Sequence, residues 1–301
     1  PLVDADRFVE VYSHPAANGR TRGAALSDLF WYGLAPGSHV HQEHLEAGER
    51  YDVVARTTRR FLARPRTEIA ELTERCARRV LDELGTSDLR VVRLRDLMMP
   101  IWAEVYYELV FGERCPSRAR ALVVANATDV ITALKCCGLR HMDRRDRLTR
   151  FLRERLASGP PVQPLPTLLS PEEQAWYLQG TFFNTAVVQM SEAMAHLLLA
   201  LAQNPDVQRR LAAEPEDHVY ADQVIDESLR RYPLFGIAHR ITTDEIVVGD
   251  SRSLPAGSVL CFNYPEFHAA GFERPEVFDP DRWPGMHRRE SKYIPFGVTA
   301  N

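Results

Sequence analysis

The stretch that starts at Pro171 constrains the fold more than any other part of this sequence, because no further proline follows until Pro205. Ser170 is a preferred N-cap residue, Pro171 takes the first helical position, and Glu173 completes a capping box. The pattern predicts one helix of about 30 residues, about 45–50 Å long. Because most of its surface is apolar, such a helix is expected to cross the middle of a folded molecule.

The first two-thirds of the chain predict further helices. Apolar side chains at spacings of three and four residues predict a helix over 67–84, and Gly85 supplies its stop. Two more helices are predicted over 100–111 and 119–134. The segment SGPPVQPLP, residues 158–166, predicts a loop, since proline removes backbone donors and blocks a continuing helix.

The last third changes character after a shorter helix that ends near Arg231. Two short β-like runs, 245–248 and 259–264, are bounded by turn residues, and proline, glycine and aromatic residues dominate from Pro265 onward. Helices first and a small mixed tail second favour a mainly α (α+β) fold over alternating βαβ units. We expect a single domain with a long central helix and a small β and meander region near its C-terminus.

Composition excludes several function classes. The 301 residues are 45% hydrophobic and 26% charged, as in ordinary soluble globular proteins, and the net charge is -4. A phosphate-binding surface needs excess positive charge, so no nucleic-acid partner is predicted. No apolar run approaches the ~18–20 residues that a membrane span requires, so no membrane partner is predicted either. Nearly all basic residues are arginine, which indicates a GC-rich bacterial genome.

The cysteines indicate a reducing compartment. The chain has five, an odd number at irregular spacings, which argues against a disulfide framework. The adjacent Cys136 and Cys137 have no second pair to complete a tetrahedral metal site. Buried or incidental thiols in a cytoplasmic protein are the prediction.

An ordered series of motifs carries the chemistry. In DESLRRYP, Glu227 and Arg230 stand three residues apart on one helical face, close enough to pair. Alone, E-x-x-R is common on solvated helices. Here it is followed by AHRITTDEIVVGD, then LPAGSVL, then RPEVFDPDRW and finally YIPFG.

In this order and spacing, the chain resembles the cytochrome P450 family, the haem-thiolate monooxygenases. The resemblance is strongest over 186–297 and diffuse before Leu97. It implies that Glu227 and Arg230 form a structural triad with Arg282, in which a guanidinium–carboxylate network holds the meander against the helix. It further implies haem b as the cofactor, with Arg240 pairing with one haem propionate and Arg56 supplying a second such contact; for Arg240 the alternative is a surface arginine on a strand.

Phe296 and Gly297 match the start of the family's haem-binding turn. The cysteine thiolate that ligates the iron, and that favours O–O cleavage, comes several residues later in the family. No cysteine of this chain lies in that context, so no metal ligand is predicted within it and the haem-iron cysteine is expected beyond Asn301. With a start at Pro1 rather than Met, residues 1–301 are expected to be a partial P450-like domain, itself inactive.

The long helix departs from the family pattern. Aligned on LALAQNPDVQRRL, the family's oxygen-activation site puts Val188 in the acid position and Gln189 in the threonine position. Valine cannot relay protons. One turn earlier, Asn184 and Thr185 offer an amide–alcohol pair, which requires a downstream insertion or a local irregularity of the helix. Gln189 and Thr185 are the candidate catalytic residues.

Three hypotheses on function remain open. The chain resembles a monooxygenase that oxidises a small organic metabolite, apolar or aromatic, with O2 and electrons from a ferredoxin and ferredoxin reductase, in secondary metabolism. The changed helix also fits a haem enzyme that uses peroxide or non-oxygenating chemistry. The third hypothesis is a haemless family member that acts as a non-catalytic partner of another enzyme.

A histidine-rich loop follows Ser38. His39, His41 and His44 stand among Glu43 and Glu46, without the rigid frame of a metal site. A polar loop, a metal site and a loop lining a substrate pocket are the open interpretations, the last because of the resemblance. In separate positions, His196 and His268 are interpreted as ordinary packed or loop histidines.

Overall fold

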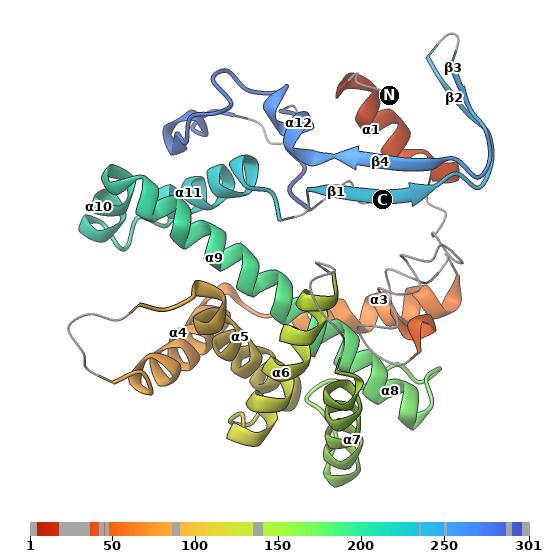
Figure 1. Ribbon diagram of the computed structural model, residues 1–301, viewed down its shortest axis with the longest axis vertical. Helices are drawn as coiled ribbons and strands as arrows, with labels where there is room; N and C mark the ends of the chain where they lie inside the picture. The colour runs from red at the N-terminus through yellow and green to blue at the C-terminus, as the bar shows by residue number, and fades with distance from the viewer. Residues whose placement is uncertain are drawn as a thin grey trace. The chain divides into compact units, whose positions relative to one another are not determined.

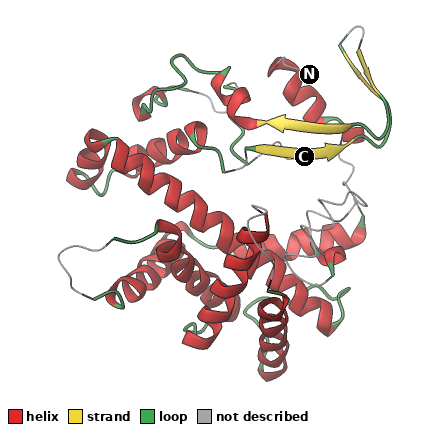
Figure 2. Ribbon diagram, viewed as in Figure 1, coloured by secondary structure: helices red, strands yellow, loops and turns green. Residues whose placement is uncertain are grey.

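The computed structural model describes residues 5–17, 37–41, 45, 48–85, 91–134, 141–234, 236–249, 252–286 and 291–296. The chain forms two compact units, residues 22–192 and residues 1–21 with 193–301. Helices dominate, and the described strands form two short pairs (Figure 2). The prediction of a mainly helical chain with one long helix and a small β region is confirmed.

The unit of residues 22–192 is helical in its described part (Figure 1). Its helices are η2 (Ser38–Val40), α3 (Glu49–Leu62), α4 (Arg66–Asp82), α5 (Leu94–Phe111), α6 (Ser117–Leu134), α7 (Met142–Ser158), α8 (Pro171–Leu178) and η4 (Gln179–Ala186). Along the chain, α4 packs on α5, α5 on α6, α6 on α7 and α7 on α8, and η4 contacts α5, α6 and α7. The buried Phe61, Tyr107, Phe182 and Phe183 lie in this core.

Helix α5 begins earlier than the sequence predicts. It starts at Leu94 rather than Pro100, and it is apolar nearly all round, as expected of a helix buried on every side. Pro100 lies inside it and removes one hydrogen bond, to the carbonyl four residues earlier. That loss near the helix start is tolerated because the surrounding side chains are buried.

The long helix runs over Pro171–Gln203 as α8, η4 and α9 (Val187–Gln203). Its predicted capping box is confirmed: the Glu173 amide donates to Ser170 Oγ at 3.3 Å and the Ser170 amide donates to Glu173 Oε2 at 2.8 Å. The helix is long and apolar enough to cross a membrane, whereas the sequence predicted no segment of that length. Core helices of globular domains can have the same length and composition. The eight residues of η4 are π-helical, which the sequence did not predict.

The other unit combines helices with two strand pairs. Its described elements are α1 (Ala5–Ser13), η1 (Pro15–Ala17), α10 (Pro205–Ala213), α11 (His218–Arg231), β1 (Ile237–Ile241), β2 (Ile246–Val248), β3 (Arg252–Leu254), β4 (Val259–Asn263), α12 (Tyr264–Ala269) and η5 (Pro280–Arg282). The two runs predicted as strands belong to different pairs, because β2 pairs with β3 and β4 pairs with β1. Both pairs are antiparallel.

Alternation along β4 sets the core of this unit. Leu260 and Phe262 are buried, and the residues that flank Leu260 are exposed, which is the pattern of a strand with one covered face. Val11 and Tyr12 of α1 and Ile246 of β2 belong to the same buried cluster. Helix α1 is therefore held by the strands that follow α11.

Candidate functional site

The side chains of Glu227, Arg230 and Arg282 form one buried ionic cluster. Arg230 donates from Nε to Glu227 Oε2 and from Nη2 to Glu227 Oε1, each at 2.8 Å. Arg282 Nε donates to Glu227 Oε1 at 3.2 Å. The side chains of Glu227 and Arg230 are 0% and 1% exposed. The spacing of three residues on α11 places the first pair on one face, and η5 supplies the third member.

Two further donors complete the coordination of Glu227. The indole Nε1 of Trp283 donates to Glu227 Oε2 at 3.2 Å, and the backbone amide of Asp279 donates to Oε1 at 2.8 Å. A buried carboxylate is stable only when its oxygens are fully hydrogen-bonded, and here five donors reach two oxygens. Trp283 and Asp279 were not predicted as partners of Glu227, although both lie in the run FDPDRW.

The arginines of the cluster also bind backbone carbonyls of the meander. Arg230 donates to the carbonyls of Pro275 and Val277 at 2.9 and 3.1 Å. Arg282 donates to the carbonyls of Glu273 and Val277 at 2.8 and 3.1 Å. Lysine could not make these forked contacts. The cluster thereby fixes an irregular segment that has no strand or helix of its own.

Arg240 lies on β1 with no carboxylate partner among the described residues. Its Nη1 donates to the carbonyl of His239 at 2.9 Å and its Nη2 donates to the hydroxyl of Tyr12 at 3.3 Å. Its Nε is buried without a hydrogen-bond acceptor among the described residues. A permanently charged guanidinium with an unused buried N–H is suited to an anionic acceptor. Arg240 therefore lies on a strand, half-buried, with one N–H that could bind an anion.

The segment that approaches the predicted haem-binding turn is held by α11 and α12. Tyr293 is buried, and its hydroxyl donates to Asp226 Oδ1 at 3.0 Å. The amide of Ile294 donates to Nε2 of His268 at 3.1 Å. Phe296 is 75% exposed, and Gly297 lies outside the described residues. His268 is packed, as predicted, but it also makes contacts that the sequence analysis did not predict.

The π-helical segment contains the first candidate of the oxygen-activation site. Thr185 lies in η4 and Gln189 lies in α9, and both side chains are half-buried. Asn184 is buried and accepts a hydrogen bond from Nδ2 of Asn126 on α6. A π-helical turn is the kind of local irregularity that the Asn184–Thr185 alternative requires, because it changes the register of the residues that follow.

Other polar contacts hold η4 in place. The hydroxyl of Thr149 on α7 donates to Gln179 Oε1 at 2.5 Å, and Gln179 Nε2 donates to the carbonyl of Arg145 at 3.1 Å. The ring of His41 lies directly against Gly180, where a Cβ atom would otherwise stand. The helix irregularity is therefore supported from neighbouring elements on several sides.

The histidine-rich loop does not gather its described histidines into one site. His39 Nε2 lies 2.9 Å from Glu173 Oε1, at the start of α8, whereas His41 packs on Gly180. The Ser170 amide is the main cause that lowers the pKa of Glu173 to about 2. His44, Glu43 and Glu46 lie outside the described residues.

Arg56 lies on α3 and is exposed, with no hydrogen bond or ion pair to any residue that the structure describes. It belongs with Thr185 and Gln189 to the unit of residues 22–192, whereas the glutamate–arginine cluster, Arg240 and Phe296 belong to the other unit. The structure brings the triad together, as predicted, and leaves Arg56 available for an anion.

The described cysteines are unsuited to metal binding. Burial raises the pKa of Cys76 and of Cys115 to about 12, and Cys261 is exposed on β4. Cys76 lies near Glu104 and Glu108, but Arg79 ion-pairs with both carboxylates. The arginine supplies the positive charge that a cation would bring. Cys136 and Cys137 lie outside the described residues.

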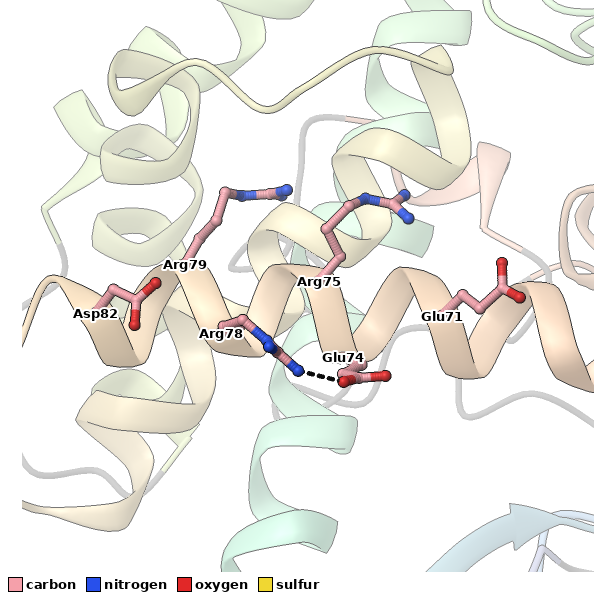
Figure 3. A pocket seen from close by; sticks show the side chains of 6 residues that line it. All are labelled: Glu71, Glu74, Arg75, Arg78, Arg79 and Asp82. Atoms are coloured by element: carbon pink, nitrogen blue, oxygen red, sulfur yellow. Dashed lines mark hydrogen bonds and ion pairs between the residues drawn. The ribbon is translucent and has the colours of Figure 1, made fainter.

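A surface hollow of about 350 Å³ lies along α4 (Figure 3). It is lined by Glu71, Glu74, Arg75, Arg78, Arg79 and Asp82. Its lining residues all come from one helix, and Arg78 pairs with Glu74 at 2.5 Å within it. Alternating charges that neutralise one another along a helix are typical of a solvated surface. The lining residues of the hollow include no nucleophile and no converging polar groups.

The residues of the candidate site lie in the part of the chain that matches a known protein family. The cytochrome P450 family model matches residues 171–298, which include the long helix, the glutamate–arginine cluster, Arg240 and Phe296. A cyclooctat-9-en-7-ol 5-monooxygenase of Streptomyces melanosporofaciens is 29% identical over 140 residues, 40% of this chain and 30% of that protein. Mouse thromboxane-A synthase is 32% identical over 131 residues, 36% of this chain and 24% of that protein. The matched part thus spans less than a third of these relatives.

Solved structures share the fold over nearly the whole chain. A six-coordinated cytochrome P450 of Thermus thermophilus has a TM-score of 0.69 and 20% identity, covering 97% of this chain and 76% of that one. Cytochrome P450SP alpha in complex with (R)-ibuprophen has a TM-score of 0.76 and 17% identity, covering 97% and 74%. Taken with the family-model match, these findings show that the chain has the cytochrome P450 fold and that residues 171–298 belong to the cytochrome P450 family.

Proposed function

We propose that this chain is part of a haem-thiolate monooxygenase that acts on a small organic metabolite, using O2 and electrons from a separate redox protein. The observation that carries the proposal is the buried cluster of Glu227, Arg230 and Arg282, which binds the meander carbonyls ahead of the Phe296 turn. A network of this kind stabilises an irregular segment at a cost in desolvation. We interpret the network as holding the segment in one conformation, as a segment that presents a ligand to a cofactor requires.

The described residues fit haem b through Arg240. Its buried Nε has no acceptor among them, and a propionate carboxylate would supply one. Arg56 is the second candidate for a propionate, since it is exposed and has no described partner. Phe296 and Gly297 would begin the turn beside the iron, and the thiolate is assigned to a cysteine beyond Asn301. When bound, thiolate-ligated haem supplies the activation of O2.

Thr185 is the proposed proton donor of the oxygen-activation site. Its hydroxyl can donate a hydrogen bond and pass on a proton, whereas Val188 can do neither. Asn184 cannot ionise at neutral pH, so its role is to orient the segment through Asn126. Gln189 is the alternative, and it could hold an ordered water by its amide. The π-helical geometry of η4 favours Thr185.

The substrate is proposed to be lipophilic. One relative is named for cyclooctat-9-en-7-ol, another for taurochenodeoxycholic 6 alpha-hydroxylation, and a structural neighbour holds retinoic acid. The shared feature of these three compounds is a large hydrocarbon skeleton. A bacterial secondary-metabolic substrate of that class, a ferredoxin and ferredoxin reductase as electron donors, and a cytoplasmic location complete the proposal. The structural likeness over 97% of the chain supports residues 1–301 as part of one P450-like domain.

A haemless protein would have no propionate to bind, so it would not require an arginine with a free N–H at this position. Arg240 has no carboxylate partner among the described residues, which favours a bound anion. Substituting Arg240→Gln is expected to lower haem retention about tenfold or more, because one charge-assisted contact is lost. The matched control is Arg252→Gln, an exposed arginine on the neighbouring strand pair. Equal haem retention in both variants would contradict the role of Arg240.

Turnover distinguishes the two haem mechanisms. With a ferredoxin system and O2, the full-length protein is expected to oxidise a lipophilic test substrate, and Thr185→Val is expected to uncouple reductant consumption from product by about 10²-fold, within the range of proton-transfer catalysis. Thr181→Val, on the same segment, is the control. Product formed only with added peroxide, at the same rate in Thr185→Val, would contradict the dioxygen mechanism.

A further inference from the structure

His268 joins two segments that are distant in the sequence. It lies on α12 and is fully buried, at 0% exposure. Its Nδ1 is 3.3 Å from the carbonyl oxygen of Arg230, and its Nε2 is 3.1 Å from the amide nitrogen of Ile294. The imidazole therefore bridges the end of α11 and the segment that leads to Phe296.

These two contacts determine the protonation of the ring. A carbonyl oxygen only accepts, so Nδ1 must carry the proton, and a backbone amide only donates, so Nε2 must be bare. Both bonds form only in the neutral Nδ1–H tautomer. An imidazolium would place an N–H at Nε2 against the N–H of Ile294.

Both backbone groups depend on the histidine. The carbonyl of Arg230 is in the last turn of α11, where carbonyls have no partner within the helix. The amide of Ile294 is the last backbone donor before Pro295, which has none. The histidine thus fixes the segment at its last available amide before the turn.

The surroundings oppose a charge on the ring. Burial is the main cause that lowers the pKa of His268 to about 4, the charge of Arg230 lowers it further, and the hydrogen bond to the Arg230 carbonyl opposes both. The rings of Tyr264 and Tyr293 lie 6.4 and 5.4 Å away. The nearby carboxylates have other partners, since Glu227 binds the two arginines and Asp226 binds Tyr293.

We propose that His268 is a positioning residue, which in its neutral form fixes the Tyr293–Phe296 segment to α11 and releases it when protonated. It acts through the backbone of Ile294 and touches no reacting group. Its consequence for haem binding rests on the proposed function, since the released segment leads into the turn assigned to the cofactor. The fixing of the segment itself does not rest on it.

Amide hydrogen exchange of Ile294 tests the contact directly. At pH 7, His268→Leu is expected to lower the protection factor of the Ile294 amide about tenfold, because one hydrogen bond is lost. His268→Gln is expected to restore most of it, since an amide side chain offers an acceptor and a donor. The reference is the amide of Tyr232, which donates within α11 to Ser228 at 2.8 Å.

The pH dependence separates positioning from simple packing. In the unsubstituted chain, protection of Ile294 relative to Tyr232 is expected to fall as pH is lowered toward 4, whereas in His268→Gln it is expected to stay constant. Protection that does not change with pH in the unsubstituted chain would overturn the proposal, even if His268→Leu does not fold. Absence of haem binding, with Ile294 behaving as expected, would instead contradict the proposed function alone.

Discussion

Glu227 lies at the centre of the buried network that joins α11 to the meander. Five hydrogen bonds converge on its carboxylate, from Arg230, Arg282, Trp283 and the amide of Asp279. Removing the charge would leave two arginines without an anion, one of them fully buried. Burying an uncompensated charge costs far more than the ion pair itself contributes.

We expect Glu227→Gln to lower the free energy of unfolding by about 3–5 kcal/mol. The matched control is Glu216→Gln, whose carboxylate is exposed and lies 4.0 Å from His218; it is expected to change stability by less than about 0.5 kcal/mol. Chemical denaturation of both variants measures the difference. Similar midpoints for the two variants would contradict the buried network.

His268 makes a pH-dependent contribution to the free energy of unfolding. Its folded-state pKa of about 4 lies below the ordinary histidine value of 6.5, so the unfolded chain binds more protons between those pH values and stability rises with pH there. The stabilisation is complete above about pH 6.5 and is lost as pH falls toward 4. We expect a loss of about 3 kcal/mol across that window.

Denaturation at several pH values, compared with His268→Gln, measures this contribution. Other groups titrate in the same window, so the difference between the two proteins is the informative quantity. A difference that stays constant from about pH 7 to about pH 4 would show that His268 is not kept neutral by the fold.

At the scale of elements, η4 is the feature that departs from regular structure. Eight π-helical residues interrupt the long helix, and the polar contacts of Gln179 and Asn184 hold them to α7 and α6. Gly180 is needed for close approach rather than for backbone freedom, because the ring of His41 occupies the place of a Cβ atom.

We therefore expect Gly180→Ala to displace His41 and to lower the free energy of unfolding by about 1–3 kcal/mol. Gly236→Ala is the control, since no described atom lies within 4 Å of the Cβ position there. Thermal denaturation of the two variants measures the difference in their stability. If Gly180→Ala is as stable as the parent chain, the packing of His41 on η4 is wrong.

Sequence patterns predicted the elements that local signals specify. The capping box of Ser170 and Glu173 marks the start of the long helix, and the E-x-x-R spacing places two members of the triad on one face. These signals are local, so they can be recognised without knowing what packs nearby. The early start of α5 was missed because Pro100 is a helix breaker in isolation and a tolerated residue in a buried helix.

Features that depend on distant partners could not be predicted in the same way. The π-helical segment η4 is held by polar groups of α6 and α7, and β4 pairs with β1, a strand outside the two runs that the alternating pattern predicted. The bridging role of His268 depends on a carbonyl and an amide far from it in the sequence. Periodicity carries no information on such contacts.

At the scale of the whole molecule, the central claim is a thiolate-ligated haem. The family-model match over residues 171–298, the five-donor environment of Glu227 and the buried Nε of Arg240 support that proposal. The proposed function places the iron ligand on a cysteine beyond Asn301. We therefore predict that the gene encodes a cysteine within about ten residues of Gly297, which sequencing downstream of the Asn301 codon tests.

The most direct measurement is the absorption spectrum of the full-length protein, expressed with haem supply, reduced and exposed to carbon monoxide. We predict the red-shifted Soret band that is characteristic of thiolate-ligated haem. A Soret band typical of histidine ligation, or a protein purified without haem, would contradict the account.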